Sequence, residues 1–218
     1  MNDNDIVKII NVLKRKLEVW EFPIVSSLAE EKHTPFQILI STLLSLRTKD
    51  ETTAVACKKL FDLASTPEEM LKLSEEKIIQ AIYPVGFYRN KTKTILHICR
   101  ELIGRYQSKV PDTTEELLTL KGVGRKTANL VAALGYNKEE ICVDTHVHRI
   151  SNRLGFVKTK TPEETEYALR GKLPKKDWSV YNTLMVAHGK NICRPISPFC
   201  SRCPVSTYCD RVDVIKSR

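Results

Sequence analysis

A lysine and an aspartate near the middle of the chain could carry covalent chemistry. Lys126 stands two residues after the turn Lys121–Gly124, at the expected start of a helix. The positive end of a helix dipole disfavours a charged ammonium group, and an uncharged lysine amine is a nucleophile that forms Schiff bases. Asp144 follows the β-prone run Ile141–Val143, which could bring its carboxylate near the same place. The segment is therefore predicted to combine an amine nucleophile with a carboxylate.

The turn before Lys126 has the composition of a phosphate-binding site. Gly122 and Gly124 allow positive φ and leave no side chain to hold a ligand away. Backbone N–H groups at the N-terminus of the following helix would then face a phosphate. An ordinary tight turn is the alternative, since Gly-x-Gly before a helix is common. The residues assigned to this contact are Lys121, Gly122, Val123, Gly124 and Arg125.

Four cysteines near the C-terminus form a second candidate site. Their spacing is C-x₆-C-x₂-C-x₅-C within 17 residues, and the residues are Cys193, Cys200, Cys203 and Cys209. Thiolates crowded this closely bind a soft metal centre, and a reducing cytosol keeps them available. Zinc usually takes two short-spaced cysteine pairs that lie far apart, whereas only one such pair is present here. The spacing favours an iron–sulfur cluster over zinc and leaves both open.

Apolar residues at helical spacing predict that most of the chain is α-helical. One face of a first helix carries Ile6, Ile9, Ile10, Leu13 and Leu17. A second helix opens at Thr34-Pro35 and is apolar almost all round, which indicates a central core helix. Further helices are expected at Glu51–Phe61, Pro67–Leu73, Glu75–Ile82, Lys91–Tyr106, Pro162–Gly171 and Asp177–Gly189, on both sides of the glycine turn, and from Thr145 onward.

Helix ends and the remaining cysteines complete this prediction. Thr113 and Glu116 have capping-box spacing before the first helix of the hairpin, and Gly135 is expected to end the second. Cys57, Cys99 and Cys142 lie in apolar surroundings and are assigned to the core.

Two polar or aromatic segments between helices could contact a ligand. Arg47 follows the core helix, and its alternatives are a base contact, a phosphate contact or simple solvation. The segment Tyr83–Lys91 is expected to be a loop because it contains Pro84 and Gly86. An exposed aromatic ring there could wedge into a base stack, but the residues alone favour packing of Phe87 and Tyr88 beneath the loop.

The composition is that of a folded protein with a surplus of positive charge. Hydrophobic residues make up 42% and charged residues 28%, and 35 Lys and Arg against 26 Asp and Glu give a net charge of +9. Such a surplus favours a polyanionic partner, with nucleic acid first, although a merely basic protein is the alternative. No apolar run approaches the length of a membrane helix, and no signal peptide is recognisable. The protein is therefore expected in the cytoplasm, associated with the nucleoid, and as a monomer.

The run LKGVGRKTAN followed by VDTHVHR resembles the helix-hairpin-helix DNA glycosylases of the endonuclease III type. The resemblance extends over nearly the whole chain, including YPVGF and the C-terminal cysteines. It implies an all-α fold of two lobes: a six-helix bundle lobe at 28–135, and an iron–sulfur cluster lobe that joins 1–27 to 136–218. It also implies a [4Fe–4S] cluster on the four cysteines.

The same resemblance implies a function in base excision repair. The chain would be a bifunctional glycosylase and AP lyase that removes oxidised pyrimidines from double-stranded DNA and also cuts at abasic sites. Lys126 would be the nucleophile, and Asp144 would stabilise positive charge on the sugar and assist proton transfer. Phe87 would be the apolar wedge, and His146 would orient its surroundings. Arg47 departs from the glutamine often found in the family, which bears on how the opposite strand is read.

Three alternatives remain at the level of the sequence. The first is a relative that removes mismatched thymine or adenine, although relatives that remove adenine generally lack the lysine at the position of Lys126. The second is a helix-hairpin-helix module that binds DNA without cutting it. The third is an iron–sulfur electron carrier that binds DNA incidentally, which leaves Lys126 and Asp144 unexplained.

Overall fold

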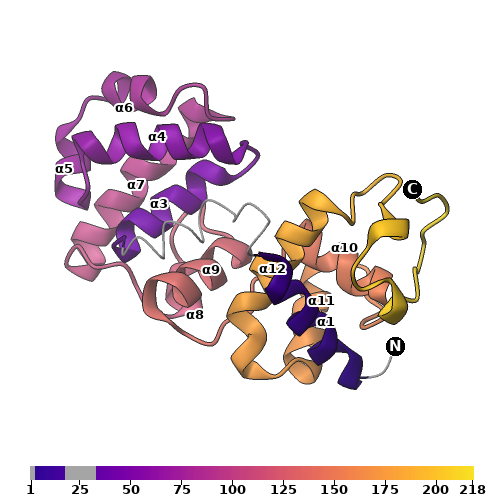
Figure 1. Cartoon of the computed structure of the whole chain (residues 1–218). Coiled ribbons are helices and arrows are strands. Elements are labelled where there is room, and N and C mark those ends of the chain that lie inside the picture. The colour runs from indigo at the N-terminus through magenta and orange to yellow at the C-terminus, as the bar shows by residue number, and fades with distance from the viewer. Residues whose placement is uncertain (1–2, 18–32) are drawn as a thin grey trace. The chain divides into compact units, whose positions relative to one another are not determined.

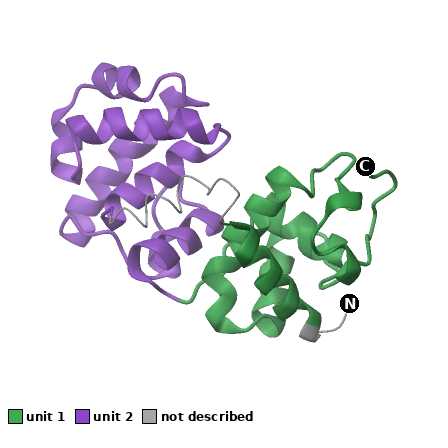
Figure 2. Ribbon diagram, viewed as in Figure 1, with its two compact units in different colours: residues 1–23, 139–218 green, residues 24–138 purple. Residues whose placement is uncertain are grey.

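The computed structural model describes residues 3–17 and 33–218, and within these ranges the regular elements are helices, with no strands (Figure 1). The chain divides into two compact units (Figure 2). Unit 1 holds Met1–Pro23 and Glu139–Arg218, and unit 2 holds Ile24–Lys138. The boundaries expected from the sequence were at 27/28, which lies outside the described residues, and at 135/136. The all-α prediction is confirmed for the part of the chain that the structure describes.

Unit 2 packs its helices around α3, which is buried almost all round. Its described helices are α3 (Pro35–Ser45), α4 (Asp50–Leu63), α5 (Pro67–Lys72), α6 (Glu75–Ile82), α7 (Tyr88–Tyr106), α8 (Thr114–Leu117) and α9 (Arg125–Tyr136). Thr34 caps α3: its hydroxyl accepts from the backbone N–H of Gln37, whose side chain accepts from the Thr34 N–H. Helix α3 contacts α4, α7 and α9, so the apolar pattern seen in the sequence becomes the centre of this unit.

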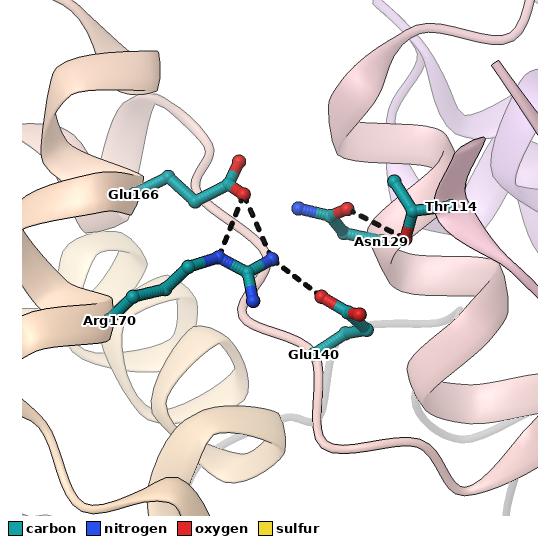
Figure 3. Close-up of polar contacts among 5 residues, drawn as sticks. All are labelled: Thr114, Asn129, Glu140, Glu166 and Arg170. Carbon is teal, nitrogen blue, oxygen red and sulfur yellow. Dashed lines mark hydrogen bonds and ion pairs between the residues drawn. The ribbon is translucent and has the colours of Figure 1, made fainter.

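Unit 1 joins the N-terminal helix to the C-terminal third of the chain. Its described α-helices are α1 (Asp3–Leu17), α10 (Thr145–Leu154), α11 (Pro162–Lys172) and α12 (Trp178–Asn191), with short 3₁₀ turns at Lys175–Asp177, Cys200–Arg202 and Ser206–Tyr208. Helix α12 contacts both α1 and α10. The predicted face of α1, including Ile9 and Leu13, is buried. Arg170 on α11 bonds Glu166 one turn earlier and also Glu140, which fixes the segment that enters this unit (Figure 3).

Two local predictions differ from the structure. Helix α7 begins at Tyr88, so the predicted loop that ran to Lys91 is shorter. Gly135 lies inside α9, which continues to Tyr136 and ends with Asn137 in the left-handed region. The β-prone run Ile141–Val143 forms no strand, since its buried side chains pack into the core of unit 1 without a partner strand. No described helix is long and apolar enough to cross a membrane.

Candidate functional site

The glycine turn is held by apolar side chains on both sides. Leu117 at the end of α8, Leu120 and Val123 are all buried in the core of unit 2. The backbone N–H of Val123 bonds the carbonyl of Leu120 at 3.0 Å, which closes the turn. Behind it, the hydroxyl of Thr114 donates to the amide oxygen of the buried Asn129 at 3.2 Å and ties α8 to α9 (Figure 3). The two helices of the hairpin therefore have a fixed geometry.

The two glycines of the turn have different roles. Gly122 has φ +92°, and a Cβ there would lie 2.6 Å from Cγ2 of Thr94 on α7, so this position requires glycine. Gly124 has an extended backbone (φ −93°) and precedes α9 as its N-cap, where a Cβ would meet open space. Only Gly122 uses the positive φ that the sequence suggested for both.

The residues assigned to phosphate contact lie mostly on the surface. Lys121, Gly122 and Gly124 are exposed and Arg125 is half-buried, whereas the Val123 side chain points into the core. Thr113 caps α8 with its hydroxyl, but Gly124 has no side chain to cap α9. Gly124 thus gives α9 no side-chain cap, and backbone N–H groups at helix N-termini are an arrangement that binds anions.

Lys126 is the second residue of α9 and is half-buried, while the next two residues, Thr127 and Ala128, are buried. The lysine therefore lies where the helix surface meets the glycine turn. It belongs to unit 2, and Asp144 belongs to unit 1. Their predicted pairing in one active site stays a prediction.

Asp144 is the N-cap of α10. Its Oδ1 accepts hydrogen bonds from the backbone N–H groups of His146 at 2.8 Å and Val147 at 2.9 Å. These two bonds fix the direction of the carboxylate, which is half-buried. The side chain therefore has a structural role as a helix cap, and it presents an oriented carboxylate at the start of the helix.

The polar residues that follow Asp144 are directed into unit 1. Arg149 places one nitrogen 3.1 Å from Nδ1 of His146 and donates from the same nitrogen to the carbonyl of Cys193 at 2.9 Å. Nδ1 of His148 lies 2.7 Å from the hydroxyl of Thr165. Burial lowers the pKa of Arg149 from its usual value. His146 therefore contacts an arginine that also bonds the backbone carbonyl of Cys193. The orienting role expected of His146 stays a prediction.

Arg47 and Phe87 come together on the surface of unit 2. The Arg47 guanidinium lies 5.5 Å from the centre of the Phe87 ring, and both residues are exposed, Phe87 at 59%. Tyr88 packs instead against the core and contacts Tyr83 edge to face, as the residues alone favoured. Packing of Phe87 beneath the loop, which the residues alone also favoured, is wrong, because the ring is exposed.

Lys91 and Thr48 were not predicted as site residues, although both form hydrogen bonds with the loops that carry Arg47 and Phe87. Nζ of Lys91 donates to the carbonyls of Leu44 and Leu46 and to the hydroxyl of Thr48. Half-burial lowers the pKa of Lys91 to about 8, which leaves the group charged at neutral pH. Neither residue carries a sequence signal, since a lysine early in a helix is ordinarily a surface residue.

The four C-terminal cysteines converge on one small cavity in unit 1. All four are reduced and half-buried, and they line this cavity together with Ile150 and the buried His188. Nε2 of His188 lies 3.8 Å from the sulfur of Cys203. Burial raises the pKa of Cys203 to about 11 and lowers the pKa of His188 to about 4, so the imidazole is neutral at neutral pH. The other three cysteines, Cys57, Cys99 and Cys142, are buried core residues as predicted.

Arg153 of α10 contacts the segment 193–209, which carries the four cysteines, at several points. It donates to the sulfur of Cys193 at 3.5 Å and to the carbonyls of Arg194 and Pro195, at 2.7 Å and 2.6 Å. Its own carbonyl accepts from the sulfur of Cys209 at 3.4 Å. No group of three or more His, Cys, Asp or Glu within residues 3–17 and 33–218 is arranged around a single metal ion.

Comparisons with known proteins point in one direction. Residues 40–175 match the family described as HhH-GPD superfamily base excision DNA repair protein. Over 176 residues the chain is 51% identical to the endonuclease III of Thermotoga maritima, which covers 81% of this chain and 83% of that protein. It is 43% identical to the chloroplastic endonuclease III homolog 2 of Arabidopsis thaliana, over 82% of this chain but only 48% of that longer protein. The structure also matches a solved non-covalent endonuclease III–DNA complex with a TM-score of 0.86, at 32% identity and over 97% of this chain and 96% of that one.

Proposed function

Because the chain belongs to the endonuclease III family of helix-hairpin-helix base excision repair proteins, we propose that it removes oxidised pyrimidines from duplex DNA and then cuts the strand as an AP lyase. The observation that carries this proposal is Lys126 in the first turn of α9, directly after an exposed glycine turn without a side-chain cap. The net charge of +9 and the likeness to a DNA-bound relative support a DNA partner.

The hairpin would grip the backbone of the damaged strand. Phosphate oxygens would accept from backbone N–H groups at the start of α9, and Lys121 and Arg125 would add charge contacts. A base inside the duplex stack is out of reach of an enzyme side chain, so the damaged nucleotide must turn outward. Phe87 would enter the stack in its place.

Lys126 would carry the covalent step. Its uncharged Nζ would form a bond to C1′ of the sugar while the bond between C1′ and the base breaks, and the base would leave with the bonding electrons and take up a proton. Opening of the sugar ring would give a Schiff base between Nζ and C1′. Loss of a proton from C2′ would then break the C3′–O bond and release the 3′ phosphate by β-elimination. Asp144, oriented by the N-terminus of α10, would stabilise positive charge on the sugar and transfer protons.

The four cysteines would hold a [4Fe–4S] cluster, which when bound would cross-link the C-terminal segment. The residues fit this group: the four cysteines form no disulfide and line one cavity. In a cubane each thiolate binds a different iron, which suits four cysteines on one compact segment. Zinc usually takes two short-spaced cysteine pairs, whereas only Cys200 and Cys203 form such a pair here. Arg153 and His188 would surround the cluster ligands with hydrogen-bond donors.

The experiment is strand cleavage of a duplex that contains thymine glycol, with EDTA present. The wild-type protein is expected to release the base and nick the strand, and Lys126→Ala is expected to do neither. Lys77→Ala is the matched control, because Lys77 is an exposed lysine in the first turn of another helix of unit 2. Nicking by Lys126→Ala at the wild-type rate would refute the assigned nucleophile.

A second candidate is a mismatch-directed glycosylase, and Arg47 is the observation that favours it. A guanidinium in place of an amide side chain changes which groups on the opposite base can accept a hydrogen bond. Duplexes with thymine glycol, G·T and 8-oxoguanine·A separate the two candidates. Preference for thymine glycol supports the main proposal, and preference for either mismatch replaces it.

A further inference from the structure

The loop after α3 and the loop before α7 are joined at a shared hydrogen-bonded junction in unit 2. The first loop carries Arg47, and the second carries Phe87. Both residues have a left-handed backbone, with φ of 54° and 58°, which is uncommon for residues other than glycine. Because such a conformation persists only where its surroundings hold it, the contacts around these two residues must supply that support.

Lys91 supplies one half of the junction. An ammonium group has three N–H donors and no acceptor. Nζ of Lys91 meets three acceptors, the carbonyl of Leu44 at 2.8 Å, the carbonyl of Leu46 at 2.6 Å and the hydroxyl of Thr48 at 3.2 Å. The two carbonyls belong to the C-terminal end of α3, where a cation is stabilised by the helix dipole. A side chain of α7 thus caps the C-terminal end of α3 before Arg47 and also contacts Thr48 directly after it.

Thr48 supplies the other half. Its hydroxyl accepts from Lys91, accepts from the backbone N–H of Gly86 at 3.2 Å and donates to the carbonyl of Leu46 at 3.3 Å. One donor and two acceptors are the full capacity of a hydroxyl group. Gly86 directly precedes Phe87, so the same hydroxyl connects the Arg47 loop to the backbone of the Phe87 loop.

The two loops are also in direct van der Waals contact. A Cβ on Gly86 would lie 2.6 Å from the carbonyl oxygen of Arg47, so only glycine permits this approach. On the outer side the Arg47 guanidinium lies over the Phe87 ring. The side chains of Arg47 and Phe87 are therefore held as a pair at the surface. The hydrogen bonds beneath them are made by Lys91 and Thr48.

We infer that Lys91 and Thr48 are positioning residues that set the geometry of Arg47 and Phe87 relative to each other, so that the pair meets DNA as one unit. Phe87 would fill the space of the turned-out nucleotide, while Arg47 reads the base on the opposite strand. This inference rests on the proposed function. It adds that selectivity for the opposite base depends on Lys91 and Thr48, which lie beneath Arg47.

The test uses the full-length protein and duplexes that carry a stable abasic-site analogue opposite each of the four bases. Thr48→Val keeps the shape of the side chain but loses the hydroxyl, and Thr48→Ser keeps the hydroxyl. We expect Thr48→Val and Lys91→Met to lose about threefold to tenfold in affinity and most of the difference among opposite bases, because each loses hydrogen bonds of the junction. Thr48→Ser should restore both. Lys93→Met is the charge-matched control, since Lys93 is exposed on the same helix.

A double-mutant cycle separates positioning from general stability. If Thr48 acts through the pair, Thr48→Val has no further effect on opposite-base selectivity once Arg47 and Phe87 are both alanine. An equal loss in that background overturns the inference, and so does wild-type selectivity in a folded Thr48→Val protein. Nicking of a natural abasic-site duplex by the wild type is scored separately. Its absence refutes the proposed function, while the binding comparison still decides the role of the junction.

Discussion

Arg47 and Phe87 in unit 2 and the four cysteines in unit 1 are all held in short connecting segments, but by different means. The unit 2 loops are flanked by the fully buried Leu44 and Val85, and side-chain hydrogen bonds fix their backbones. In the segment 193–218 only Pro198 and Val205 are buried. Apolar burial is the main source of folding free energy, so this segment has little of its own. The unit 2 loops are thus held by packing and side-chain hydrogen bonds, whereas the segment 193–218 buries little apolar surface, and the proposed cluster would add a cross-link there.

The largest effect is expected from removing one cysteine of the proposed cluster. Cys203→Ala should abolish iron binding and lower the stability of unit 1 by several kcal/mol or more, because binding free energy at a structural metal site contributes directly to folding. Iron content, visible absorbance and thermal unfolding measure this. Cys142→Ala, in the core of the same unit, should retain the iron. Wild-type stability of the iron-free Cys203→Ala protein would contradict the claim that the segment 193–218 depends on the cluster.

The glycine turn offers a matched pair of substitutions within unit 2. Gly122→Ala should cost about 1–3 kcal/mol, because the position has positive φ and its Cβ would meet Thr94. Gly124→Ala should change stability by less than about 1 kcal/mol, since its φ is ordinary and the space around it is open. Urea unfolding of the two variants measures both changes in the free energy of unfolding. Equal losses would show that the turn is not held by its contact with α7.

Substitutions of Asp144 separate its role as the N-cap of α10 from its proposed role in catalysis. Asparagine caps helices as well as aspartate does, so Asp144→Asn should keep stability within about 0.5 kcal/mol, whereas Asp144→Ala should lose about 1 kcal/mol. Base release by Asp144→Asn should nevertheless fall by about a hundredfold or more, because its amide cannot exchange protons as a carboxylate does. If both variants lost activity only in proportion to stability, the residue would be a cap alone.

The smallest effect is expected for alkylation of the buried core thiols Cys57 and Cys99. Burial raises the pKa of Cys57 and raises that of Cys99 to about 12. The reactive form is the thiolate, so at about pH 8 the folded protein should not be alkylated at these positions. After iron is removed with a chelator, labelling should appear first at the half-buried Cys193 and Cys200, and later at Cys203, because burial raises the pKa of Cys203 to about 11. Early labelling of Cys99 would show that the core of unit 2 opens more readily than its packing suggests.

The sequence predicted the parts of this molecule that depend on local rules. The periodicity of α1 and α3 and the Thr-Pro helix starts all correspond to observed elements, since capping and amphipathicity act within one turn. The β-prone run before Asp144 forms no strand, because β-propensity yields a strand only where a partner strand exists. The continuation of α9 past Gly135 was missed because packing can override the propensity of one glycine.

The candidate site was predictable where a residue type declares its chemistry and hidden where a role depends on distant contacts. Lys126 and the four cysteines stand out by type and spacing. Lys91 does not, because its acceptors lie more than forty residues earlier in the chain and only the packing of α7 on α3 brings them to it. Thr48 likewise gains its role from Gly86, 38 residues away.

The central claim is that the amine of Lys126 forms a Schiff base with the sugar. Borohydride reduction during turnover of an abasic-site duplex should trap a covalent complex, and peptide mapping of that complex should place the DNA on Lys126. Trapping should be lost in Lys126→Ala and kept in Lys77→Ala. An adduct of equal yield with Lys126→Ala, or one mapped to another residue of the wild-type protein, would contradict the account.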